Sequence, residues 1–109
     1  MSYMIEKLEK KIRKCIEEGL EEGYYLIQQQ TYDEDGGFCA AGMCVRESYR
    51  NYVRARNYLG LSQTEMTKFT NGFDGVWQPS NTPYRDLYDL GTRLRDYYMV
   101  DPDVTKSPY

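Results

Sequence analysis

The sequence contains no histidine. Histidine is the commonest general base near neutral pH and the commonest metal ligand in proteins. Without it, Cys39 and Cys44 lack the usual partner that activates a thiol for nucleophilic catalysis. Their apolar neighbours also favour the inert, protonated thiol. Four-ligand zinc patterns and phosphate-binding glycine loops are absent as well. We therefore expect a protein that is not an enzyme and that carries no cofactor or metal.

Cysteine and long apolar runs are scarce too. Three cysteines do not make a disulfide framework, and no apolar run reaches the roughly 18 residues of a membrane span. The first residues are charged, unlike the apolar stretch of a secretion signal. The net charge of −3 argues against binding nucleic acid through a general basic surface. Together these features predict free thiols, no membrane contact and a cytoplasmic location.

Helical periodicity is the clearest feature that the sequence does contain. Between residues 3 and 22, apolar side chains recur at helical spacing and predict an amphipathic helix that stops at Gly23. Such a stripe normally packs against a core. A homodimer seam is the alternative interpretation, although the pattern lasts for less than three heptads.

Two further helices are marked by their first residues. Ser62 and Glu65 form a capping-box pattern, and Asn71-Gly72 is typical of the end of a helix. Thr82-Pro83 predicts the start of a last helix, with Thr82 as the cap and Pro83 in the first helical position.

The uncharged stretch in the middle of the chain organises the predicted fold. We interpret residues 38–53 as a buried central helix, because its first half is apolar on every side. The alternative is a short β-hairpin in which residues 24–32 pair with 38–45. The prediction is one mainly α domain of four or five helices over residues 1–100, followed by a flexible tail at 101–109.

The segment 72–82 is predicted to be a long loop, and it carries the only tryptophan. Loops carry binding residues more often than core elements do, and Trp is among the residues most enriched at binding hot spots. The chain also has twelve tyrosines, a residue enriched at protein interfaces. We expect a protein partner to contact four residues of this loop: Phe73, Asp74, Val76 and Trp77.

A row of arginines is the second candidate surface. Arg46, Arg50 and Arg54 are four residues apart and would share one helix face, with tyrosines between them. Arg50 and Arg54 are the second choice for contact with a protein partner. The alternative function is a nucleic-acid-binding regulator, in which the three arginines follow a phosphate backbone while the tyrosines stack on bases.

The segment from Gly37 to Met43 resembles a pattern in small uncharacterised proteins of tailed phages. In that pattern a Cys-Ala-x-Gly core helix precedes a helix beginning Leu-Gly-Leu-Ser, an Asn/Asp-Gly loop and a final amphipathic helix. The resemblance brings no catalytic residues. It implies a phage accessory protein in a bacterial cytoplasm that binds and disables a host or defence protein, as a stoichiometric inhibitor or adaptor; a structural phage component is the alternative. The later parts of the pattern fall at Leu59–Ser62, Asn71–Gly75 and Tyr84–Tyr98.

Overall fold

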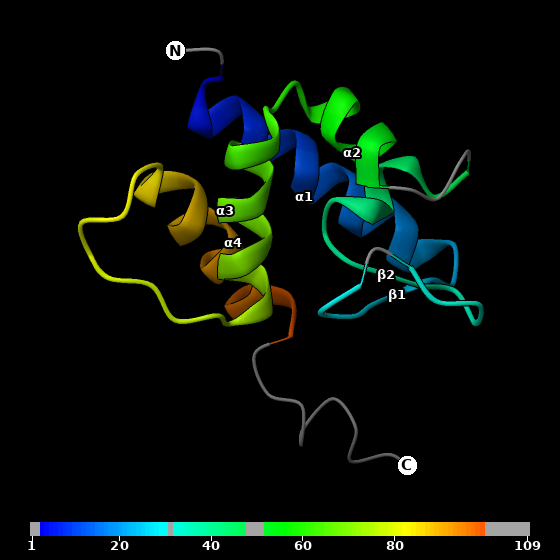
Figure 1. Ribbon diagram of the computed structural model, residues 1–109. Helices are drawn as coiled ribbons and strands as arrows, with labels where there is room; N and C mark the ends of the chain where they lie inside the picture. The colour runs from blue at the N-terminus through cyan, green and yellow to red at the C-terminus, as the bar shows by residue number, and fades with distance from the viewer. Residues whose placement is uncertain (1–2, 31, 48–51, 100–109) are drawn as a thin grey trace.

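The computed structural model describes residues 3–30, 32–47 and 52–99. Within these ranges the protein is mainly helical, which confirms the predicted fold class (Figure 1). The predicted tail at 101–109 lies outside the described residues. The elements are α1 (Ile5–Glu21), β1 (Tyr25–Leu26), β2 (Gly37–Phe38), the 3₁₀ turn η1 (Gly42–Val45), α2 (Tyr52–Leu59), α3 (Gln63–Asp74) and α4 (Arg85–Tyr98).

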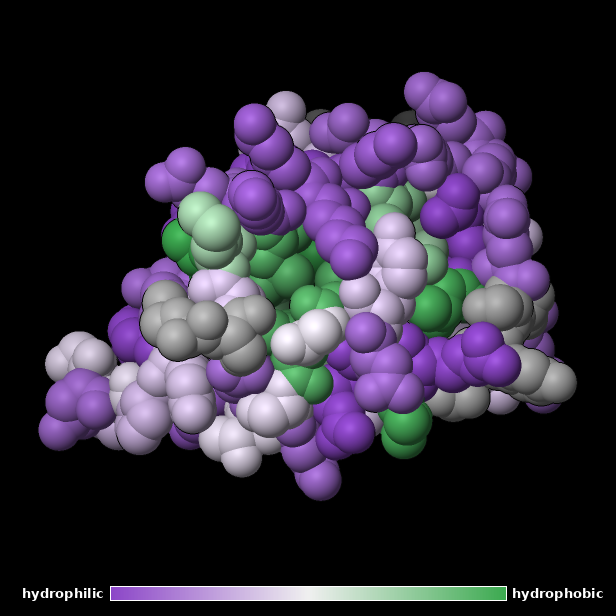
Figure 2. All heavy atoms as spheres, turned by 90° about the horizontal axis from the view of Figure 1, so that it is seen from above, coloured by the Kyte–Doolittle hydropathy of each residue, from purple (hydrophilic) through white to green (hydrophobic). Residues whose placement is uncertain are grey.

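Helices α3 and α4 form the tightest pair in the molecule, because a glycine on each lets the two backbones touch. A Cβ atom added at Gly72 would lie 2.0 Å from the carbonyl oxygen of Tyr88, and one at Gly91 would lie 2.2 Å from that of Phe69. Around this crossing lie fully buried apolar side chains. From above, the molecule shows mostly hydrophilic residues, with apolar ones visible in hollows between them (Figure 2). The buried side chains of the pair include Met66, Phe69, Phe73, Leu87, Leu90 and Leu94.

Helix α1 follows the predicted amphipathic segment closely and buries Leu8, Ile12 and Ile16. Polar side chains join it to α4 along its length. Hydrogen bonds connect Glu9 and Glu17 on α1 to Arg93 (2.9 Å) and Tyr98 (2.6 Å), and Tyr3, just before α1, donates to Asp86 (2.9 Å). The first and last helices of the described chain are therefore held together directly.

The continuous central helix predicted over 38–53 is wrong. Phe38 ends a short strand, η1 spans only Gly42–Val45, and α2 begins at Tyr52. Small apolar residues suit any buried backbone, so their burial did not require a helix. Here the Cys39 Sγ atom accepts the Gly42 N–H at 3.2 Å, which supports a tight turn. The segment is nevertheless central, because Phe38, Ala40, Ala41 and Met43 are fully buried.

The alternative β-hairpin is also wrong in its geometry. Strands β1 and β2 do pair, but they run parallel, with Tyr25 opposite Gly37 and Leu26 opposite Phe38. An isolated antiparallel bridge joins Tyr32 to Phe38. The chain between the strands therefore makes a wide loop instead of a tight turn.

Of the three boundaries predicted for the last two helices, one is correct and two are wrong. The capping box is present: the Glu65 N–H donates to the Ser62 side chain, and the Glu65 carboxylate accepts the Ser62 N–H. However, α3 continues through Gly72 and ends at the left-handed Gly75. Gly72 serves the contact with α4 and is not a stop signal. Helix α4 starts at Arg85 instead of Pro83.

Candidate protein-binding site

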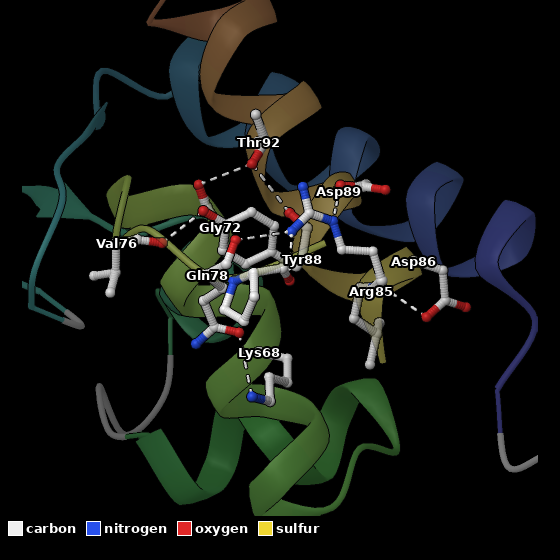
Figure 3. Close-up of polar contacts among 11 residues, drawn as sticks. Lys68, Gly72, Val76, Gln78, Arg85, Asp86, Tyr88, Asp89 and Thr92 are labelled. Atoms are coloured by element: carbon white, nitrogen blue, oxygen red, sulfur yellow. Dashed lines mark hydrogen bonds and ion pairs between the residues drawn. The ribbon is translucent and has the colours of Figure 1, made fainter. Parts of the chain in front are cut away.

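The connection between α3 and α4 is a long loop whose backbone is fixed by hydrogen bonds (Figure 3). The Tyr88 hydroxyl donates to the carbonyl of Val76 at 2.5 Å. Arg85 donates to the carbonyls of Gln78 and Pro79, both at 3.2 Å, and Lys68 donates to the Gln78 side chain at 3.2 Å. Residues on both helices thus hold the loop in one shape.

Trp77 lies at the centre of this fixed stretch, yet its side chain points away from the core. It is 80% exposed, the largest exposure among the exposed large apolar side chains, and Val76 beside it is 47% exposed. Because bonds to Val76 and Gln78 fix the backbone on both sides, little further ordering is needed when a partner covers the indole. Such preorganisation lowers the entropic cost of binding.

Phe73 is not part of this surface. The sequence placed it on the loop, but it lies in the last turn of α3 and is 1% exposed. Its backbone N–H lies 2.6 Å from the position of a Cβ atom on Gly91, so it belongs to the contact between α3 and α4. Phe73 is therefore a core residue and cannot contact a partner without local unfolding.

Asp74, the last residue of α3, lines a small cavity. Phe69, Phe73 and Ala40 provide apolar walls, and Thr70 and Asp74 add polar groups. The cavity has a volume of about 140 Å³, similar to the about 150 Å³ at which an engineered apolar cavity holds one benzene molecule. We call it the Asp74 pocket.

The loop after β1 forms one side of the Asp74 pocket and is attached to α3. The Gln29 N–H donates to Asp74 Oδ1 at 2.9 Å, and the Gln28 side chain donates to the Phe73 carbonyl at 2.7 Å. Gln29 has a φ of 72°, in the left-handed region, which costs a non-glycine residue on the order of 1 kcal/mol or more. Partial burial raises the pKa of Asp74, whereas the bond from Gln29 acts in the opposite direction.

The predicted arginine row is not brought together as a binding surface by the described residues. Arg46 is 9% exposed and forms a two-bond ion pair with Glu22, at 2.8 and 2.7 Å. Arg54 is exposed on α2 and lines an open cleft with Tyr58. Arg50 lies outside the described residues. The even spacing assumed one helix through all three positions, whereas η1 and α2 are separate elements.

The cysteines show a contact that the sequence did not reveal. Cys15 on α1 lies within reach of a hydrogen bond from Cys44 on η1 and of one from Tyr58. The bond from Cys44 lowers the pKa of Cys15 to about 7, whereas the same bond and burial raise the pKa of Cys44. Burial raises the pKa of Cys39 to about 11. Burial therefore keeps the Cys39 thiol protonated near neutral pH, whereas Cys15 loses its proton more readily.

Sequence reasoning missed polar residues that help to line the Asp74 pocket, namely Gln29, Gln30 and Thr70. No sequence signal marks Gln29, because a left-handed φ is expected of glycine or asparagine rather than glutamine. Within residues 3–30, 32–47 and 52–99, no three His, Cys, Asp or Glu side chains gather in a way that could hold a metal ion. The helices in those ranges are also too short or too polar to cross a membrane.

No protein-family model, curated protein or solved structure matches the chain. Its function must therefore be inferred from its own residues.

Proposed function

We propose that the protein is a stoichiometric protein-binding module whose main anchor is Trp77. The observation that carries this proposal is a largely exposed indole on a loop whose backbone is hydrogen-bonded on both sides of it. An indole of this kind is ready to fill a pocket on a partner.

The energetics favour contact with another protein. An aromatic side chain of this type buries about 150–250 Å² when it is covered, and each Å² contributes about 25 cal/mol. Trp77 therefore offers on the order of 4–6 kcal/mol of gross burial energy, of which a typical hot spot retains at least about 2 kcal/mol. The folded chain gains little from Trp77, since only a fifth of its surface is covered.

The resemblance to tailed-phage proteins supplies the biological setting of the proposal. In that setting the partner is a host or defence protein in a bacterial cytoplasm, and the module inhibits it or adapts it to another function. Nucleic-acid binding is the less favoured alternative, because the Arg46 guanidinium is already neutralised by Glu22. A gel-shift series would support that alternative if it showed binding that weakens steeply as salt rises.

Capture from a bacterial lysate tests the proposal. The wild-type chain, Trp77→Ala and Tyr97→Ala would be immobilised in parallel. Tyr97 is a matched control, because it is an aromatic residue on α4 with 65% exposure. We expect a protein that is retained by the wild type and by Tyr97→Ala, and whose affinity for Trp77→Ala is at least about 30-fold lower, the equivalent of about 2 kcal/mol.

Titration of the captured protein then separates a binder from an enzyme. A stoichiometric inhibitor reaches full effect only near equal concentrations. A full effect at a hundredth of the target concentration would contradict the proposal, as would unchanged capture by Trp77→Ala.

A further inference from the structure

The Asp74 pocket is too small for an ordinary small-molecule ligand. Its volume of about 140 Å³ lies below the roughly 300–1,000 Å³ of such sites. A single side chain of a protein partner is the largest group that fits. The apolar walls formed by Phe69, Phe73 and Ala40 require that this side chain have an apolar stem.

The carboxylate of Asp74, which lines the pocket, selects the end of that side chain. Asp74 is partly buried, and burial disfavours its charged form. Within the part of the chain that the structure describes, the Gln29 N–H is the one hydrogen-bond donor to this carboxylate. A cation close to Asp74 would relieve the cost of burial. An uncharged donor would relieve it less, and an anionic side chain would increase it.

The bond from Gln29 also distinguishes between the two common cations. It occupies Asp74 Oδ1, and Oδ2 accepts no hydrogen bond from the described residues. Arginine binds carboxylates best through both oxygens at once. The ammonium group of lysine is a compact point charge that needs only one of them. A lysine side chain also places four methylene groups against apolar walls while its charged end reaches the carboxylate.

We propose that the Asp74 pocket receives a lysine side chain of the protein partner, with the stem against Phe69 and Phe73 and the ammonium group on Asp74. This inference rests on the proposed function, since it assumes a protein partner. The geometry allows both contacts at once: Asp74 and Trp77 are three residues apart, so their Cα atoms are separated by at most about 11 Å. A standard interface covers about 800 Å² on each partner, enough to include both.

The test uses two small probes and the full chain. N-acetyl-lysine methylamide carries the ammonium group, whereas N-acetyl-norleucine methylamide has the same four-carbon stem without it. Each would be titrated while the amide NMR signals of Gln29, Thr70 and Asp74 are followed. We expect saturable shifts with the lysine probe and binding at least about tenfold weaker with the norleucine probe.

Two variants test whether the lysine probe binds at Asp74. Asp74→Asn keeps an oxygen that can accept the Gln29 N–H but removes the charge, and it should weaken binding of the lysine probe at least about tenfold. Asp96→Asn is the matched control, because its carboxylate is 60% exposed and pairs with Arg95. It should leave binding of the probe unchanged. The comparison of the two probes on the wild-type chain remains decisive even if Asp74→Asn folds poorly.

The outcomes separate this inference from the proposed function. Equal binding of both probes, no shifts near Gln29 or unaltered binding by folded Asp74→Asn would each overturn the lysine pocket. Trp77→Ala should bind the lysine probe normally, since Trp77 does not line the cavity. If the partner is lost by Trp77→Ala but fully retained by Asp74→Asn, the proposed function stands and the lysine pocket is refuted.

Discussion

Replacing Gly91 by alanine should be one of the most damaging single changes in the protein. The new Cβ atom would lie 2.2 Å from the Phe69 carbonyl oxygen and 2.6 Å from the Phe73 backbone nitrogen. Comfortable contacts begin near 3.5 Å, so α4 must move away from α3 by roughly 1 Å. Both obstacles are backbone atoms, which cannot rotate aside as a side chain can.

The size of the loss follows from the packing around the crossing. A gap of about 0.5–1 Å forfeits a quarter to a half of each dispersion contact that it opens, and overpacked cores lose about 1–3 kcal/mol or more. Alanine returns about 1 kcal/mol through its higher helix propensity. We expect Gly91→Ala to lower the free energy of unfolding by at least about 2 kcal/mol, measured by urea titration.

Gly19→Ala is the matched comparison, because Gly19 is also a buried glycine within a helix. Its added Cβ would lie 2.2 Å from the Met43 sulfur, but a methionine side chain has three rotatable bonds and can move. We expect Gly19→Ala to lose less than half as much stability as Gly91→Ala. If Gly91→Ala proves neutral, or if the two variants lose equal stability, the close backbone contact between α3 and α4 is not what holds the helices together.

Three further predictions concern the residues of the candidate site and the thiol pair. Trp77→Ala should cost at most about 1 kcal/mol of stability, because only about 50 Å² of the indole is covered. Phe73→Ala should cost about 3–5 kcal/mol, because Phe73 is a core residue. Equal losses of the two variants in urea titration would refute the surface position of Trp77. The raised pKa of Asp74 means that the folded state binds this proton more tightly than the unfolded state, so its contribution to stability falls as pH rises from below 3.8 through the raised value. Asp74→Asn should therefore be at least as stable as the wild type at neutral pH, with the difference shrinking below the ordinary pKa; a clear loss of stability at neutral pH would contradict this. As pH rises, thiolate absorbance should increase with a first midpoint near pH 7, and Cys15→Ser should abolish that first step. A first midpoint near the ordinary thiol pKa of 9.0 would argue against the bond from Cys44.

Features that depend on neighbouring residues could be predicted from the sequence. The amphipathic stripe of α1 and the capping box of Ser62 and Glu65 involve contacts within a few residues, so the local pattern contains the necessary information. The mainly α class followed from these elements. The sequence predicted contact of Trp77 with a partner, and the structure shows that its side chain is exposed.

Features that depend on distant residues could not be predicted in the same way. Gly72 looked like a helix end, yet it is a glycine because the Tyr88 carbonyl occupies the space of its side chain. That one misinterpretation ended α3 too early and moved Phe73 and Asp74 from a helix into a predicted loop. Half of the predicted loop site was thereby misplaced. The left-handed Gln29 depends on a bond to Asp74, 45 residues away, and has no local signature.

The bonds between α1 and α4 affect how the chain folds during its synthesis. They join residues that are 81 to 84 positions apart. Ribosomes add about 5–20 residues per second, so α1 waits about 4–16 seconds before its partners on α4 exist. During that interval the stripe formed by Leu8, Ile12 and Ile16 lacks part of its final cover and is open to chaperones and proteases. The yield of protein in the cell should therefore depend on the rate of translation as well as on the stability of the finished fold.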